Sequence, residues 1–224
     1  TIATGYANAP LKQGEPPDFG FLYTGKGLEF DGVADYVNLT SINWALDDNA
    51  SGAVSFWFNA DTADVGATSQ HMFSARDGNT DTRLYVRLTD NGILGIAMGD
   101  SGTEITDLDY VAGVWNYVVL TWASDVGTVY LNGLKHGTTV TAIGAGSGAN
   151  SYELTLGAYA RSVSSNLYAG KMSNVQIWDT AWSESDVQYA YDHPEQLASA
   201  ATKTVLSESN LKAWYPMNEG NPRS

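Results

Sequence analysis

Hydrophobic and polar residues alternate along several short stretches of this chain. In the stretch 54–59, VSFWFN, one valine and two phenylalanines fall on one side of an extended chain, and Ser55, Trp57 and Asn59 fall on the other. In 83–88, RLYVRL, the three aliphatic residues oppose Arg83, Tyr85 and Arg87 in the same way. This period of two is typical of strands that bury one face, and the second stretch predicts a polar and aromatic outer face.

Runs of β-branched and aromatic residues, separated by clusters of Gly, Asn and Asp, predict about eleven strands. They are 27–31, 36–40, 54–59, 71–75, 83–89, 93–98, 115–122, 128–132, 154–159, 167–178 and 211–217. The dipeptides Asn91-Gly92 and Asn132-Gly133 are hairpin signals of the type I′ kind. Helical start and stop signals occur in 183–191, where Ser183 is a candidate N-cap and Pro194 follows the end.

These elements predict an all-β fold, a two-sheet antiparallel β-sandwich with one short helix near the C-terminus. Residues 1–26 contain prolines and glycines without either periodicity, and we expect an extended N-terminal arm or linker there. Residues 27–224 are then the sandwich, because all-β domains of about 200–250 residues commonly form one unit.

Composition narrows the classes of partner. The chain has 25 Asp and Glu against 11 Lys and Arg, a formal net charge of −14, which disfavours nucleic acid and anionic lipid. It contains no cysteine, which removes disulfides, thiol nucleophiles and zinc–thiolate sites. The longest apolar runs are of strand length, shorter than the roughly 20 residues of a membrane-spanning helix, and we expect no membrane insertion.

Four segments, in order, resemble the laminin G-like jelly roll of the concanavalin A-like lectin/glucanase superfamily. The first is GLEFDG at 27–32 with DYV at 35–37, and the second is VSFWF at 54–58. The third runs from WNYVVLTW at 115–122 into VYLNG at 129–133, and the fourth from LYAGKM at 167–172 through VQIWD at 175–179 to AWSESDV at 181–187. The resemblance covers residues 27–191 and implies the same sandwich.

The resemblance implies a non-catalytic, lectin-like recognition or adhesion module that binds glycans on an extracellular, cell or virion surface. An alternative is a structural interaction domain of a larger assembly, such as a homo-oligomer or a virion protein. A glycoside hydrolase is the remaining alternative. We expect no enzyme, because the Glu-x-Asp-x-x-Glu strand motif of the superfamily's glycosidases is absent from the sequence.

The outward positions of the strands are the candidates for glycan contact, because sugars stack on aromatic rings and their hydroxyl groups require planar donors. They are Trp57, Arg83, Tyr85 and Arg87, with His71 and Arg76. The alternative is that Trp57 and Tyr85 pack beneath a loop or against a second protomer.

Calcium is the candidate ion, because it takes six to eight oxygen ligands of the kind that acidic loops supply. One candidate is the loop with Asp77, Asn79 and Asp81, whose oxygens lie at alternate positions. The other is Asp31 with Asp179, which the resemblance places near the terminal strands. Asx-turns explain the same residues without a metal.

Overall fold

The computed structural model describes most of the chain from residue 26 to residue 217. The described ranges are 26–39, 41–42, 51–62, 68–77, 82–98, 104–124, 126–141, 152–160, 165–201 and 204–217. Apart from Lys26, the predicted N-terminal arm lies outside them. No helix within these ranges is long and apolar enough to cross a bilayer.

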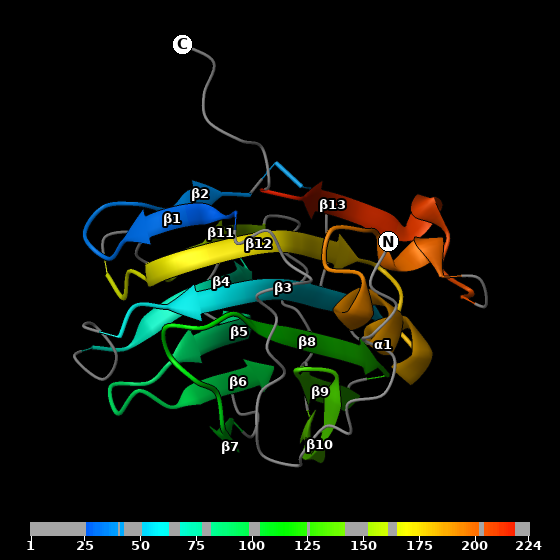
Figure 1. The fold of residues 1–224 in the computed structure, drawn as a ribbon, viewed down its shortest axis with the longest axis horizontal. Helices are drawn as coiled ribbons and strands as arrows, with labels where there is room; N and C mark the ends of the chain where they lie inside the picture. Colours follow the sequence, from blue (N-terminus) through cyan, green and yellow to red (C-terminus); the bar gives the residue numbers. More distant parts are fainter. Residues whose placement is uncertain are drawn as a thin grey trace, which may run out of the picture.

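Two antiparallel sheets face each other, as the sequence predicts (Figure 1). The first sheet has the order β1 (Leu28–Asp31), β12 (Ala169–Trp178), β3 (Gly52–Ala60), β8 (Asn116–Ala123), β9 (Val126–Leu131) and β10 (Leu134–Thr141), and β13 (Leu211–Tyr215) also pairs with β12. The second sheet has the order β2 (Val37–Asn38), β11 (Tyr152–Leu156), β4 (Gln70–Asp77), β5 (Thr82–Leu88), β6 (Leu94–Met98) and β7 (Ile105–Leu108).

The core between the sheets confirms the predicted alternation. Val54, Phe56 and Phe58 of β3 point into it and are almost wholly buried, and the aliphatic residues of β5 meet them from the other sheet. Burial of apolar side chains contributes about 1.5–3 kcal/mol each. The period-two pattern therefore identified the inner face of both sheets.

A second buried cluster lies on the outer face of the first sheet, beneath helix α1 (Glu184–Asp192). Ser183 is its N-cap and forms a capping box with Asp186, as two reciprocal side-chain to backbone hydrogen bonds show. The helix turns Val187 and Tyr191 toward the sheet. Two short 3-10 helices, η2 (Ala198–Ala200) and η3 (Glu208–Asn210), follow before β13.

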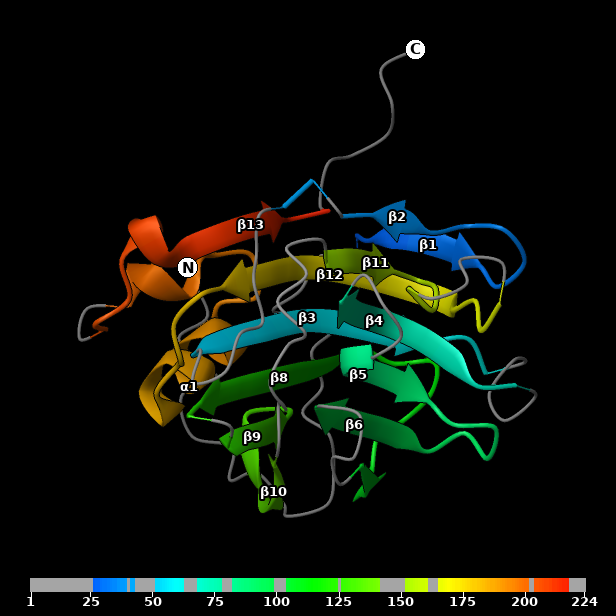
Figure 2. The ribbon, with the colours of Figure 1, turned by 180° about the vertical axis from the view of Figure 1, so that it is seen from behind.

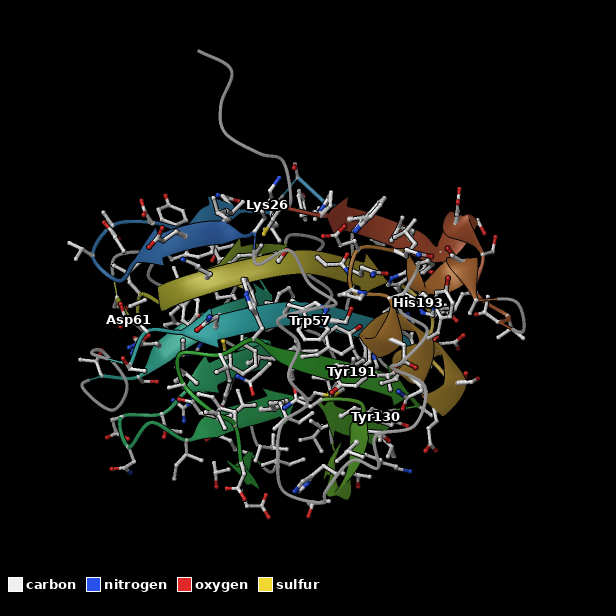
Figure 3. The ribbon with its side chains drawn as sticks, viewed as in Figure 1. Lys26, Trp57, Asp61, Tyr130, Tyr191 and His193 are labelled. Atoms are coloured by element: carbon white, nitrogen blue, oxygen red, sulfur yellow. The ribbon has the colours of Figure 1, made fainter. Side chains whose placement is uncertain are left out.

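Trp57 is at the centre of this second cluster. Its side chain is 0% exposed and stacks on Tyr117 at 4.9 Å and on Tyr191 of α1 at 5.8 Å between ring centroids. Figure 3 shows Trp57 and Tyr191 side by side. The prediction that Trp57 points to the outer face is right, but the prediction that it is available to a ligand is wrong, because α1 covers that face.

The two predicted hairpins form, one of them with a different turn. Asn132 and Gly133 have φ of 52° and 77°, as a type I′ turn requires. At Asn91-Gly92 only Gly92 has a positive φ, 70°, and the Gly92 N–H donates to the Thr89 carbonyl at 2.9 Å. The loop between β5 and β6 is therefore longer than a two-residue type I′ turn. It consists of a type I turn followed by a glycine in the left-handed conformation.

The strand prediction missed β7 and β10 and misplaced β11 by a few residues. The short β7, ITDL, has too few residues for alternation to be recognised.

Strands β1 and β13 lie at one edge of the first sheet, where they pair with the first and second halves of β12. The first and last described strands therefore lie along the same edge of the first sheet.

Truncation of Trp57 tests the buried cluster. Because the ring is fully enclosed by the sheet and α1, Trp57→Ala should lower the free energy of unfolding by about 3–5 kcal/mol. Trp214→Ala is the control, since Trp214 on β13 is 37% exposed. Urea denaturation measures both, and a loss below about 1 kcal/mol for Trp57→Ala would contradict the burial.

Candidate functional site

The outer face of the second sheet holds a group of polar and aromatic side chains. On β5, Tyr85 and Arg87 point outward because Leu84, Val86 and Leu88 occupy the core. Arg87 lies opposite His71 of β4. Figure 2 shows the molecule from behind, with β4, β5 and β6 side by side.

A β-bulge in β4 brings His71 to this face. The register passes from His71 opposite Arg87 to Phe73 opposite Val86, so that Met72 is the extra residue. Met72 and Phe73 both point into the core. Regular alternation with Phe73 would have turned His71 inward, and the bulge therefore places its ring beside Arg87.

Arg87 forms a bidentate ion pair with Glu104. Its Nε and Nη2 each donate to one carboxylate oxygen at 2.8 Å, and Nη1 donates to the Ser69 hydroxyl at 3.3 Å. The guanidinium also lies 5.1 Å from the centroid of the Tyr85 ring. Two parallel N–H bonds from a planar guanidinium to one carboxylate form one of the strongest side-chain hydrogen-bond arrangements. They hold both charged groups in fixed orientations at the surface.

Gly95 makes room for this ion pair. It lies opposite Arg87 in the β5–β6 register, and a Cβ at this position would collide with the Glu104 carboxylate. The side chains of Arg87 and Glu104 remain 28% and 22% exposed. The pair is therefore set into the sheet surface and still open to solvent.

His71 is buried between two tyrosines. Its ring centroid is 5.4 Å from that of Tyr85 and 4.7 Å from that of Tyr159. Burial, and secondarily the charge of Arg87, lower the pKa of His71 from 6.5 to about 3. The imidazole is neutral at ordinary pH, and its Nδ1 has no hydrogen-bond partner in the described part of the chain.

Tyr159 reaches this face through a turn at Gly157. Gly157 has a φ of 78°, and a Cβ there would collide with the Phe30 ring. Its N–H donates to the Met72 carbonyl at 3.0 Å, next to the bulge of β4. The turn leads the chain back over β4, and the Ala160 N–H donates to the Ser74 hydroxyl at 3.2 Å. A glycine is therefore needed for Tyr159 to cover His71.

A second ion pair lies further along the same face. Arg76 of β4 lies opposite Glu153 of β11, and its Nε is 2.8 Å from a carboxylate oxygen of Glu153. Glu104 and Glu153 are each turned toward their own arginine. Arg87 lies opposite His71 and Arg76 lies opposite Thr82, so the two ion pairs are about 17 Å apart along β5 at the usual rise per residue.

The structure brings together four of the six predicted ligand residues. His71, Tyr85 and Arg87 are in contact, and Arg76 lies on the same face. Trp57 belongs to the other sheet, on the opposite side of the molecule. The side chain of Arg83 lies outside the described residues. Tyr85 is partly exposed, whereas Trp57 is covered by α1, and the alternative that Tyr85 packs against a second protomer stays open.

Glu104 and Tyr159 also belong to this group of side chains, and the sequence patterns did not predict them. Glu104 lies before a strand too short to recognise, and Tyr159 is ordered by a turn rather than by a strand. Gly95 was the available signal. A glycine within a strand indicates the close approach of another group, and the Asn91-Gly92 hairpin would have placed it opposite Arg87.

The predicted calcium pair Asp31 and Asp179 is wrong. Asp31 pairs with Ala169 at one end of β12, and Asp179 follows Trp178 at the other end, about 30 Å away along an extended strand. The Asp179 carboxylate instead lies 2.6 Å from the Lys212 ammonium group and accepts from Asn210 at 3.0 Å. The two aspartates therefore cannot share an ion.

Asp31 is the cap of an Asx-turn. Its Oδ1 accepts from the N–H groups of Val33 and Ala34 at 2.8 Å and of Asp35 at 3.0 Å. These bonds, that of Ala34 first, lower the pKa of the Asp31 carboxyl. No group of three acidic or histidine side chains able to hold a metal occurs in the described ranges.

The other calcium candidate remains a prediction. Asn79 and Asp81, and the side chain of Asp77, lie outside the described residues. If this loop binds the ion, calcium should raise the melting temperature by mass action, and a chelator should reverse the rise. Asp77→Asn should abolish the rise and Asp31→Asn should not. A melting temperature that calcium leaves unchanged would exclude the loop.

The burial of His71 predicts acid sensitivity. The pKa of His71 is lowered in the folded state. The unfolded chain therefore binds a proton at His71 below about pH 6.5, whereas the folded chain binds it only near pH 3. The free energy of unfolding should therefore fall as the pH is lowered through this window, by up to about 1.4 kcal/mol per pH unit. Denaturation between pH 7 and pH 4.5 measures the slope.

His71→Phe should flatten this slope, because phenylalanine fills the same space and does not titrate. His136→Phe, on the edge strand β10, is the matched control. The contribution of the Asp31 carboxyl to the free energy of unfolding is lost only below its ordinary pKa of 3.8, which lies outside this pH range. Equal slopes for the native chain and His71→Phe would contradict the prediction.

Comparison with known proteins supports the architecture. No curated protein matches the sequence. A putative carbohydrate binding protein from Bacteroides ovatus is similar in structure, with a TM-score of 0.60 and 15% identity over 89% of this chain and 54% of that one. A sialidase from Trypanosoma rangeli has a TM-score of 0.62 and 15% sequence identity, over 76% of this chain and 28% of that one. A heptameric SAP-like pentraxin from Limulus polyphemus has a TM-score of 0.51 and 17% identity, over 73% of this chain and 80% of that one.

At these identities the structural similarity concerns the fold, which all three proteins share with this chain. The chain spans about half of the Bacteroides protein and about a quarter of the sialidase. A family model matches the sequence over residues 31–188, most of the sandwich. The chain therefore belongs to the concanavalin A-like lectin/glucanases superfamily.

Proposed function

We propose that this chain is a non-catalytic, lectin-like recognition module that binds glycans through the outer face of its second sheet. The observation that carries the proposal is the bidentate Arg87–Glu104 pair, set against Tyr85 and next to the His71–Tyr159 stack. Fixed planar donors and acceptors beside tyrosine rings match the hydroxyl groups and apolar faces of a sugar. The carbohydrate-binding fold neighbour agrees with this proposal.

The arrangement of carboxylates supports binding without cleavage. Glycoside hydrolysis requires two carboxyl groups about 5–10 Å apart across one bond, one of them able to deliver a proton. Glu104 and Glu153 are each bound to their own arginine, and the two ion pairs lie about 17 Å apart along β5 at the usual rise per residue. Among the described residues, this arrangement does not bring Glu104 and Glu153 to the spacing that glycoside cleavage requires.

The proposed setting of the module is an extracellular, cell or virion surface, where glycans are displayed. The formal net charge of −14 agrees with a surface exposed to salt rather than to nucleic acid. On the first sheet α1 covers the outer face around Trp57 and Tyr117, which favours the second sheet as the face for recognition.

Substitutions on the two sheets test the proposal. Tyr85→Ala and Arg87→Ala should each weaken glycan binding by about tenfold or more, because each removes a stacking surface or a charge-assisted donor. Trp214→Ala, an exposed aromatic on the first sheet, should leave the affinity unchanged. Glycan arrays followed by calorimetry measure binding, and thermal melts verify folding.

Three outcomes would overturn the proposal. If the folded chain binds no array glycan, glycan recognition is wrong. If Tyr85→Ala instead converts an oligomer to a monomer in light scattering, this face is a structural interface. If the purified chain releases reducing ends from a polysaccharide and one acidic substitution abolishes the release, the chain is an enzyme.

A further inference from the structure

We infer that the Arg87–Glu104 pair selects an uncharged sugar with neighbouring hydroxyl groups over acidic glycans. This inference rests on the proposed function and names its class of ligand. It follows from the hydrogen-bonding positions that the pair leaves open, from the balance of charge on the face and from the neutral rings around it.

The pair presents both donors and acceptors. Arginine has five N–H donors, and three of those of Arg87 are engaged by Glu104 and Ser69. Two remain without a partner in the described residues. The Glu104 carboxylate, which has about four lone-pair positions, is also hydrogen-bonded by Tyr85 and keeps acceptor capacity beyond that bond and the two from Arg87.

Neighbouring hydroxyl groups suit this combination. Each hydroxyl both donates and accepts, so one sugar hydroxyl can donate to Glu104 while the next accepts from Arg87. A carboxylate or sulfate group can only accept. It would gain the arginine donors and at the same time face the negative charge of Glu104 at close range.

The positive charges described on this face are already paired. Arg87 is neutralised by Glu104 and Arg76 by Glu153, both at 2.8 Å. Asp90 adds a further negative charge that acts on Arg87. An acidic sugar that used the two open N–H groups of Arg87 would face the charges of Glu104 and Asp90, and it would approach a chain of net charge −14. Both effects disfavour anionic ligands.

The aromatic residues of the face carry no charge of their own. Burial and the charge of Arg87 hold the pKa of His71 at about 3, and burial and the neighbouring Glu104 raise the pKa of Tyr85 to about 12. Both rings are therefore neutral between about pH 5 and pH 10. Within this range neither ring supplies the positive charge that would offset Glu104.

Matched pairs of saccharides test the inference. Lactose and sialyllactose, and a neutral galactan and its sulfated form, are titrated against the native chain at low and high salt. We expect at least about tenfold tighter binding of the neutral member of whichever pair binds, with little effect of salt, because no net ionic attraction is screened.

Glu104→Gln gives the decisive contrast. The substitution keeps the size of the side chain and removes the charge that neutralises Arg87. Binding of the neutral sugar should weaken, and binding of the acidic member should strengthen by about tenfold and become sensitive to salt. Asp179→Asn is the control, because it removes a carboxylate from an ion pair on the first sheet.

The outcomes separate this inference from the proposed function. Preference of the native chain for the acidic member, or an unchanged preference in a folded Glu104→Gln variant, would overturn the selection of neutral sugars and leave glycan binding standing. Binding of no member by the native chain would overturn both. If Glu104→Gln fails to fold, Arg87→Lys provides the second test, since it keeps the charge, loses the fork and should still weaken neutral binding.

Discussion

The structure depends on the burial of the central strands of the first sheet on both faces. Val54, Phe56 and Phe58 of β3 enter the core, while Trp57 of the same strand is enclosed by α1. A helix that exposed its apolar side and a sheet that exposed Trp57 and Tyr117 would each leave a large apolar surface in water. Their union stabilises the C-terminal part of the chain and closes this face to ligands.

Because α1 covers Trp57, the proposed recognition face is the outer face of the second sheet. The second sheet has its inner face in the core, and its outer face carries Tyr85, Arg87 and His71. These side chains are held by a bidentate ion pair and by ring stacking rather than left mobile. Fixed side chains lose little conformational entropy when a ligand binds, which favours affinity from a small contact area.

Small departures from regular strand geometry place the members of this face. The bulge at Met72 turns His71 outward, Gly157 leads Tyr159 over it, and Gly95 leaves space for the Glu104 carboxylate. Each departure has a physical cause: an extra residue in one strand, a positive φ, or a missing Cβ. The charged and aromatic groups of the site come from three strands and two connections, and none of the spacings between them is regular in the sequence.

The sequence alone determined the fold class, the inner faces of the strands and the capped helix. These features follow from local rules: alternation with period two, turn dipeptides, and a Ser183 cap with Asp186 three residues later. The polar and aromatic outer face of β5 was also predictable, because the aliphatic residues of that strand left Tyr85 and Arg87 no other side.

Only the tertiary structure decided which outward residues are accessible and which meet. Trp57 and Tyr85 have the same pattern in the sequence, but a helix more than 120 residues later in the chain covers one of them. The resemblance implied that Asp31 and Asp179 share an ion, but they lie at opposite ends of β12. Glu104 reaches Arg87 from a connection before β7. Such contacts depend on register, bulges and layer packing, which long-range burial determines and a local pattern does not encode.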